Sequence, residues 1–114
     1  MTKIALVVDF DFCAGKREKF LEIIRPHATG TKADEEGCLQ FDVLIPEDND
    51  NKVILVEMYK DVAALETHVA SSRLKDTRFA YADIIESRTI TKTRVDDSWE
   101  EATLQKGLIK VQSC

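Results

Sequence analysis

The residues best suited to proton-transfer chemistry in this chain are its two histidines, one glutamate and one tyrosine. His27 and His68 both fall on the apolar stripe of a predicted helix. Glu57 lies among apolar residues of a predicted strand and shares a face with Tyr59. A histidine changes its charge near neutral pH, and a carboxylate that faces a core needs a partner or a raised pKa. Together these four side chains could form an acid–base pocket.

Each of these residues also has a purely structural explanation. Either histidine could bond a backbone carbonyl within the core, since buried polar groups are generally hydrogen-bonded. Glu57 could form an ion pair with Arg88 or Lys92 of the last predicted strand. Tyr59 could serve in packing with its hydroxyl at the rim, and Asp42 could be a solvated strand residue. The spacing therefore predicts a pocket and does not name a reaction.

Alternation of apolar and polar residues predicts four strands, and a 3.6-residue period predicts helices between them. The predicted strands cover residues 3–12, 38–46, 52–60 and 86–95. The predicted helices cover residues 16–34 and, after the N-cap Asp61, two stretches up to residue 85. The order β-α-β-β-α-β is that of the ferredoxin-like α+β fold. Because its helices cover one face of the sheet, both histidines are expected to point into one cavity.

Three local features of these elements are expected from residue type. Pro26 should bend or interrupt the first helix, because proline lacks the N–H that a helix needs. Phe41 should share a strand face with Leu39, with Cys38 on the opposite face. In the last helical stretch, Phe79 is a candidate core residue.

Apolar residues occur on both sides of the first three predicted strands, and one layer of helices cannot cover both faces. We therefore expect a homodimer in which two sheets pack against each other as a dimeric α+β barrel. Residues 1–95 form the predicted domain. The tail, residues 96–114, is expected to pack on the domain or on the partner subunit, because its apolar side chains should leave water. These side chains are Trp99, Leu104, Leu108, Ile109 and Val111.

The composition limits the range of partners. The 114 residues carry a formal net charge of −5, and no basic stripe suited to nucleic acid is present. The acidic balance disfavours binding to anionic lipid, and no apolar run approaches the ~20 residues of a membrane span. The N-terminal apolar run is broken by Asp9 and Asp11 too early for a signal peptide, so a cytoplasmic location is expected.

The three cysteines, Cys13, Cys38 and Cys114, are widely spaced, and their odd number argues against a disulfide framework. No CxxC motif or Cys/His cluster indicates zinc. We expect three free thiols and no metal site.

Four segments of the chain form a combined pattern. They read IRPH at 24–27, EEGCLQFDV at 35–43, VEMYKD at 56–61 and ALETH at 64–68. This combination resembles the antibiotic biosynthesis monooxygenase-like (ABM) domain family, and the resemblance extends over residues 3–95. Within the family, the chain is especially similar to the branch that includes the phosphorylated autoinducer-2 isomerase and enzymes assigned as quinol monooxygenases.

The resemblance implies a dimeric barrel with one pocket per subunit, and chemistry without metal, flavin or haem. In monooxygenase members, a small phenol or quinol is deprotonated and then reacts directly with O2. In isomerase members, a proton is moved along a hydroxy-ketone, which can be phosphorylated. By position, His27, Glu57, Tyr59 and His68 match the family's pocket residues. The resemblance thus implies a cofactor-independent monooxygenase or an isomerase, and a non-catalytic small-molecule-binding dimer is the alternative.

One segment departs from the family pattern. Many members carry a T-P-H-F-like turn after the second helix, where this chain has SSRL at 71–74, so Arg73 replaces a histidine. A cation there could hold a phosphate or carboxylate, or it could be a surface arginine. Phe41, Asp42 and Arg73 are therefore the candidate substrate-binding residues.

Overall fold

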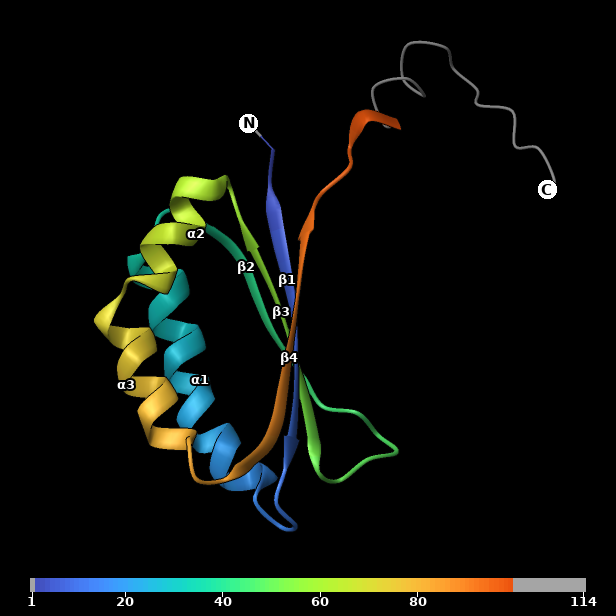
Figure 1. Cartoon of the computed structure of the whole chain (residues 1–114). Coiled ribbons are helices and arrows are strands. Elements are labelled where there is room, and N and C mark those ends of the chain that lie inside the picture. Colours follow the sequence, from blue (N-terminus) through green and yellow to red (C-terminus); the bar gives the residue numbers. More distant parts are fainter. Residues whose placement is uncertain (1, 100–114) are drawn as a thin grey trace, which may run out of the picture.

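Helices and strands follow one another along the chain in the predicted order. The computed structural model describes residues 2–99, and its elements are β1 (Ile4–Phe12), α1 (Arg17–Asp34), β2 (Cys38–Leu44), β3 (Lys52–Tyr59), α2 (Val62–Val69), α3 (Ser72–Tyr81) and β4 (Ile85–Arg94). The strands form one antiparallel sheet in the order β2-β3-β1-β4. All three helices lie on the same face of this sheet, as Figure 1 shows. The arrangement confirms the expected ferredoxin-like α+β fold.

The inner face of the sheet, which the helices cover, is set by alternation in the two central strands. In β1 and β3 every second residue is buried, and paired residues such as Leu6 and Glu57 point the same way. At the other end of β1, the ring centroid of Phe20 lies 4.7 Å from that of Phe10 and 4.6 Å from that of Phe12. This aromatic cluster fills one end of the space between helices and sheet. Polar side chains, including that of Glu57, occupy the other end of this space.

A bulge in β2 alters the faces predicted for that strand. The register of β2 against β3 shifts between Cys38 and Gln40. Consequently Cys38 and Phe41 are both buried, whereas Leu39 is 46% exposed. The prediction that Leu39 and Phe41 share a face is wrong, because one extra residue in the strand moves the alternation by one position.

Of the two effects predicted for Pro26, an interruption of α1 is not observed. The helix runs unbroken over Arg17–Asp34, with Pro26 on its exposed side. The carbonyl that loses its helical donor is that of Glu22, which is also exposed and can be hydrated instead. Ile24 and His27, which precede and follow the proline, are buried on the opposite side of the helix. Their burial stabilises the helix around Pro26.

The helices α2 and α3 are separate, and each begins at its own capping residue. The Asp61 carboxylate accepts a backbone N–H of the first turn of α2 at 2.8 Å, and the Ser71 hydroxyl accepts one of α3 at 3.2 Å. The buried residues of α3 are Leu74, Thr77 and Tyr81. Phe79, a predicted core residue, is instead 87% exposed, because it lies on the other side of the helix from this buried stripe.

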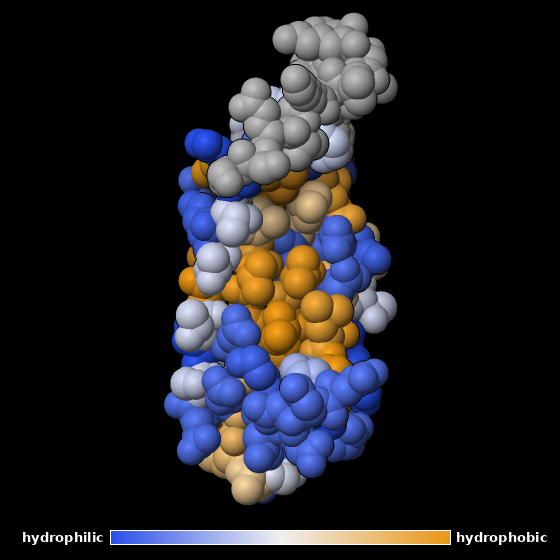
Figure 2. Space-filling view, turned by 90° about the vertical axis from the view of Figure 1, so that its right-hand side faces the viewer, coloured by the Kyte–Doolittle hydropathy of each residue, from blue (hydrophilic) through white to orange (hydrophobic). Residues whose placement is uncertain are grey.

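The outer face of the sheet carries apolar side chains that none of the three helices described within residues 2–99 covers. Val7, Ile54, Val56 and Met58 alternate with the buried inner residues and are partly exposed, and Leu44 on β2 is 45% exposed. We call these five residues the outer apolar patch. Figure 2 shows apolar side chains gathered in the middle of this face, with hydrophilic ones below them. This uncovered surface is the feature for which a second sheet was expected, and the dimer itself stays a prediction.

The chain beyond β4 is described only as far as Trp99. The predicted packing of the tail and the state of Cys114 fall on residues 100–114, outside the described residues. The Trp99 side chain is 56% exposed, and its indole N–H donates to the carbonyl of Asp96 at 3.1 Å. Cys13 and Cys38 are free thiols. Within residues 2–99, no helix combines the length and the hydropathy needed to cross a membrane.

Candidate active site

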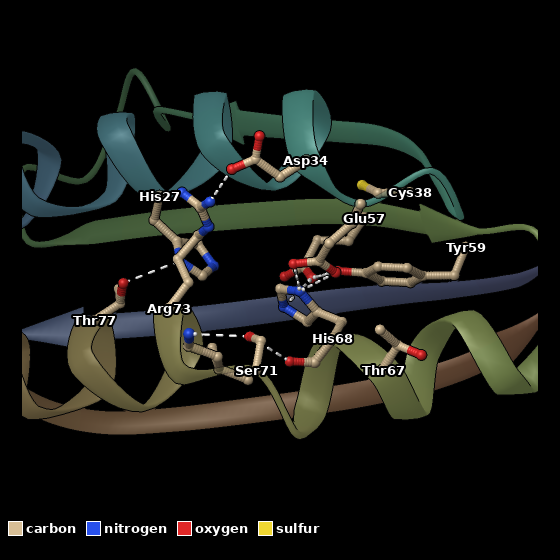
Figure 3. A network of polar contacts seen from close by, with 12 residues as sticks. His27, Asp34, Cys38, Glu57, Tyr59, Thr67, His68, Ser71, Arg73 and Thr77 are labelled. Atoms are coloured by element: carbon tan, nitrogen blue, oxygen red, sulfur yellow. Dashed lines mark hydrogen bonds and ion pairs between the residues drawn. The ribbon is translucent and has the colours of Figure 1, made fainter.

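A polar cluster lies on the inner face, at the other end of the sheet from the cluster of Phe10, Phe12 and Phe20. Glu57 and Tyr59 point the same way because they are two residues apart on β3. His68 and His27 come from the buried sides of α2 and α1, and their ring centroids are 5.5 Å apart. The structure thus brings together the four residues that the sequence suggested for acid–base chemistry (Figure 3).

A line of polar contacts runs from Tyr59 through Glu57 and His68 to Glu35. The Tyr59 hydroxyl donates to Oε1 of Glu57 at 2.6 Å. The same oxygen lies 3.7 Å from Nε2 of His68, which is too far for a direct hydrogen bond. At the other ring nitrogen, Nδ1 of His68 lies 3.0 Å and 3.2 Å from the two carboxylate oxygens of Glu35. One nitrogen of His68 is therefore held by a carboxylate, and the other is turned toward a second carboxyl group.

Glu35 is the site residue that sequence reasoning missed. It follows directly after α1, where the sequence indicates only a turn. The pairing of β2 with β3 could have indicated its position, because β2 begins at Cys38, which pairs with Tyr59 at the end of β3. A carboxylate just before β2 must therefore lie close to the helix that follows β3, which carries His68.

His27 lies in a different environment from His68. Its Nδ1 atom is 3.0 Å from the hydroxyl oxygen of Thr77, and its ring packs edge-on against Phe41 with 5.6 Å between centroids. Burial, followed by the positive charge of His68 and nearby arginines, lowers the pKa of His27 from 6.5 to about 4. His27 is therefore neutral at pH 7 and can donate one N–H.

The carboxyl of Glu57 and the hydroxyl of Tyr59 are both biased toward their protonated forms. Burial raises the pKa of Glu57, and the hydrogen bond from Tyr59 and the charge of His68 oppose this increase. Burial, and then the adjacent Glu57, raise the pKa of Tyr59, which keeps its proton at any physiological pH. Glu57 therefore holds its proton to a higher pH than an ordinary glutamate, and Tyr59 acts only as a donor to it.

A cavity of about 50 Å³ lies beside these groups, between the helices and the sheet. His27, Glu57 and His68 form its polar wall. The other lining side chains are mostly apolar and include Leu6, Val8, Ile24 and Leu55. The solvent-exposed lining residues are Val69 of α2 and Arg88 and Ile90 of β4, and Arg78 of α3 is half-buried. The cavity as it stands has room for a few water molecules, so a ring-sized ligand requires its mouth to widen.

The three candidate substrate-binding residues do not line this cavity. Arg73 pairs with Asp34 at the end of α1, as Figure 3 shows. Asp42 is exposed and lies on the outer side of β2. Phe41 is buried and supports the ring of His27. A direct contact of these residues with substrate stays a prediction that the geometry of this cavity does not support.

The structural explanations considered for the polar cluster differ from the contacts that it makes. Glu57 accepts from Tyr59, and the described residues contain no ion pair between Glu57 and Arg88 or Lys92. Both histidines contact side chains rather than backbone carbonyls. Among residues 2–99, no three His, Cys, Asp or Glu side chains are grouped so as to hold a metal ion. The chemistry that the cluster supports by itself is proton transfer.

The fold and the cluster together define a class of ferredoxin-like α+β proteins with a pocket of titratable side chains between sheet and helices. The sequence model of antibiotic biosynthesis monooxygenases matches residues 3–78. The chain therefore belongs to the antibiotic biosynthesis monooxygenase (ABM) family. A search of curated proteins finds no match.

Solved structures share the fold at low sequence identity. A Caulobacter crescentus protein, provisionally named an antibiotic biosynthesis monooxygenase, superposes with a TM-score of 0.80 at 20% identity, over 84% of this chain and 92% of its own. A Nitrosomonas europaea protein with the same provisional name has a TM-score of 0.74 at 24% identity, over 79% and 95%. A Shewanella oneidensis protein has a TM-score of 0.77 at 23% identity, over 82% and 91%.

Proposed function

We propose that this protein is a cofactor-independent monooxygenase that oxidises a small phenol or quinol. The observation that carries the proposal is the pair formed by Glu35 and His68 at the wall of a mostly apolar cavity. Membership of the ABM family supports the same reaction class.

His68 is the proposed base. With Nδ1–H donated to Glu35, the lone pair of Nε2 is directed toward the cavity and can accept the phenolic proton. The Glu35 carboxylate fixes this tautomer and stabilises the imidazolium that forms. Glu35 does not line the cavity and is a positioning residue.

Two further groups of the cavity wall stabilise the resulting phenolate. Neutral His27, when its Nδ1 accepts from the Thr77 hydroxyl, has its Nε2–H available as a donor. Glu57, in its protonated form, is a second donor to the oxyanion. Tyr59 is fully buried behind Glu57 and does not line the cavity, so it positions the carboxyl group and does not touch the substrate.

Removal of the proton makes the substrate a much stronger reductant. The phenolate gives one electron to O2, and the two radicals combine at a ring carbon that carries a hydrogen. The resulting peroxide anion takes the proton back from the His68 imidazolium and becomes a hydroperoxide. Loss of water from the hydroperoxide leaves a quinone, so the sum is phenol plus O2 to quinone plus water. The apolar part of the cavity suits both the aromatic ring and O2.

An oxygen electrode tests this proposal. A panel of hydroquinones, naphthols and hydroxy-ketones is offered to the full chain, and O2 uptake and substrate conversion are measured with and without protein. One mole of O2 per mole of quinone, with one labelled atom from ¹⁸O2 in the quinone, supports the monooxygenase. Conversion of hydroxy-ketones without O2 uptake would identify the isomerase instead, and binding without turnover would identify a binding protein.

We further propose that two copies pack through the outer apolar patch. The patch lies on the outer face of the sheet, and the cavity lies on the inner face, between sheet and helices. Pairing through the patch would therefore leave the cavity of each subunit uncovered by its partner. Burial of Val7, Ile54, Val56 and Met58 against the same residues of a second sheet would remove them from water.

A further inference from the structure

Arg78 on α3 is a cation without a counterpart. It makes no hydrogen bond or ion pair with any other residue in the described part of the chain, although its Nε atom is buried from water. Other arginines of the helices are paired: Arg25 with Glu18, and Arg73 with Asp34. A buried N–H of a charged group that loses water without gaining a partner is destabilising, so a partner from outside residues 2–99 is expected.

The Arg78 side chain also lines the cavity. Arg78 follows Thr77, the partner of His27, and both residues line the cavity. Its positive charge reaches the polar wall, where it contributes to lowering the pKa of His27 and offsets part of the increase in the pKa of Glu57. No carboxylate of the described residues lies close enough to Arg78 to form an ion pair.

Arg88 reaches the same cavity from the sheet. It is an exposed residue of β4, and its Nη1 atom donates to the hydroxyl of Tyr81 at 3.3 Å. This contact uses one of the five N–H groups of the guanidinium, so the others stay available. The two arginines stand on opposite walls, since Arg78 comes from the helix layer and Arg88 from the sheet.

We propose that Arg78 and Arg88 form an anion subsite at the mouth of the cavity, which binds a carboxylate on the substrate. Once the mouth widens to admit a ring-sized ligand, the Nε–H of Arg78, which is buried in the present conformation, and its neighbouring Nη–H become two parallel donors that match the two oxygens of a carboxylate. A planar monoanion suits a narrow cavity better than the larger phosphate group. The inference rests on the proposed function only in placing the substrate in this cavity. The substrate class becomes a phenol or quinol that carries a carboxylate remote from the reacting hydroxyl.

Binding measured without O2 separates this subsite from the catalytic proposal. The full chain is titrated anaerobically by calorimetry with 4-hydroxybenzoate, with its methyl ester and with 4-hydroxyphenyl phosphate. We expect the carboxylate to bind at least about tenfold more tightly than the ester. In Arg78→Gln, carboxylate affinity should fall by about 10- to 100-fold, and ester affinity should stay as in the wild type. Arg78→Lys keeps the charge but loses the paired donors, so it should fall between the two.

Matched controls and the contrary outcomes are defined by the same titration. Arg25→Gln removes an exposed, paired arginine of α1 and should leave all three affinities unchanged. Circular dichroism melting confirms that each variant is folded, and Arg88→Gln supplies a second test if Arg78→Gln does not fold. The proposal is overturned if the acid and the ester bind equally, if the phosphate binds more tightly than the acid, or if none of the three binds. It is also overturned if the preference for the acid over the ester persists in Arg78→Gln or is lost in Arg73→Gln. Absence of O2 uptake would refute the monooxygenase and leave the binding result intact.

Discussion

Nδ1 of His68 lies 3.0 Å from Oε1 and 3.2 Å from Oε2 of Glu35, and both side chains are largely buried. The Glu35 carboxylate therefore contacts Nδ1 of His68, and Nε2 of the same ring has no contact with Glu35. The two residues are 33 positions apart in the chain: Glu35 directly follows α1, and His68 lies in the last turn of α2. This pair is the basis of the first two predictions.

Replacement of Glu35 by Gln should reduce turnover by about 10- to 100-fold, the usual effect of losing the partner that orients a working histidine. The amide keeps the size of the side chain but cannot stabilise an imidazolium as a carboxylate does. Steady-state O2 uptake with the best quinol of the panel measures the loss. Glu36→Gln is the matched control, because Glu36 is the adjacent residue and its side chain is 92% exposed. Equal effects of the two variants would remove Glu35 from the mechanism.

Replacement of His68 by Gln should leave a folded protein whose rate falls by about a hundredfold or more, the scale of a lost general base. Glutamine keeps a polar group of comparable length and cannot take the proton. The measurement is turnover together with a thermal melt. Near-normal turnover in the folded variant would leave His68 with a structural role and make His27 the better candidate for the base.

Replacement of Tyr59 by Phe should destabilise the fold by about 1–3 kcal/mol, because it deprives a buried carboxyl of its donor. It should also raise the pKa of Glu57 further, since the Tyr59 hydrogen bond opposes the increase caused by burial. Urea denaturation measures the first effect, and a carbon NMR titration of the Glu57 carboxyl measures the second. Tyr81→Phe, which removes the other buried tyrosine hydroxyl, should leave the Glu57 titration where it was.

His27 should make the protein lose stability as the pH falls from 6.5 to about 4. Its pKa is lowered in the folded state, so its contribution is fully present above its ordinary value and disappears as protonation favours the unfolded chain. The loss amounts to at most about 3 kcal/mol. Urea denaturation of wild type and His27→Gln across this range measures it, and the variant should show a shallower decline.

Glu57 works in the opposite direction, because its raised pKa favours the folded state at low pH and its contribution is lost as the pH rises through the folded value. Comparison of His27→Gln with the wild type over one pH range cancels this effect, since both proteins retain Glu57. An identical acid decline in both proteins would mean that His27 is not the group responsible.

Placement of a charge in the outer apolar patch should dissociate the proposed homodimer. Sedimentation equilibrium of the wild type is expected to give about twice the chain mass of 12.9 kDa, and Val56→Lys should give the monomer. Glu22→Lys, on the exposed side of α1, is the control and should remain dimeric. A stable monomer for the wild type at micromolar concentration would contradict the proposal.

Much of this protein could be predicted from residue pattern, because strands and helices impose short periods on the sequence. The two-residue period of β1 and β3 placed Glu57 and Tyr59 on the inner face, and the helical period placed His27 and His68 opposite them. Both assignments depend only on neighbours along the chain. The same reasoning failed at β2, where the bulge after Cys38 exposes Leu39, and at Phe79, which the helical register turns to solvent.

What only the tertiary structure decided is which distant side chains meet. Glu35 meets His68 because the start of β2 lies beside the end of β3. Arg78 lines the cavity, whereas Arg73 pairs with Asp34 outside it. Neither relationship produces a periodic pattern in the sequence, since each depends on how α1 and α3 pack over the sheet. A periodic pattern reports which side of an element avoids water, whereas the partner of a charge depends on every element that packs around it.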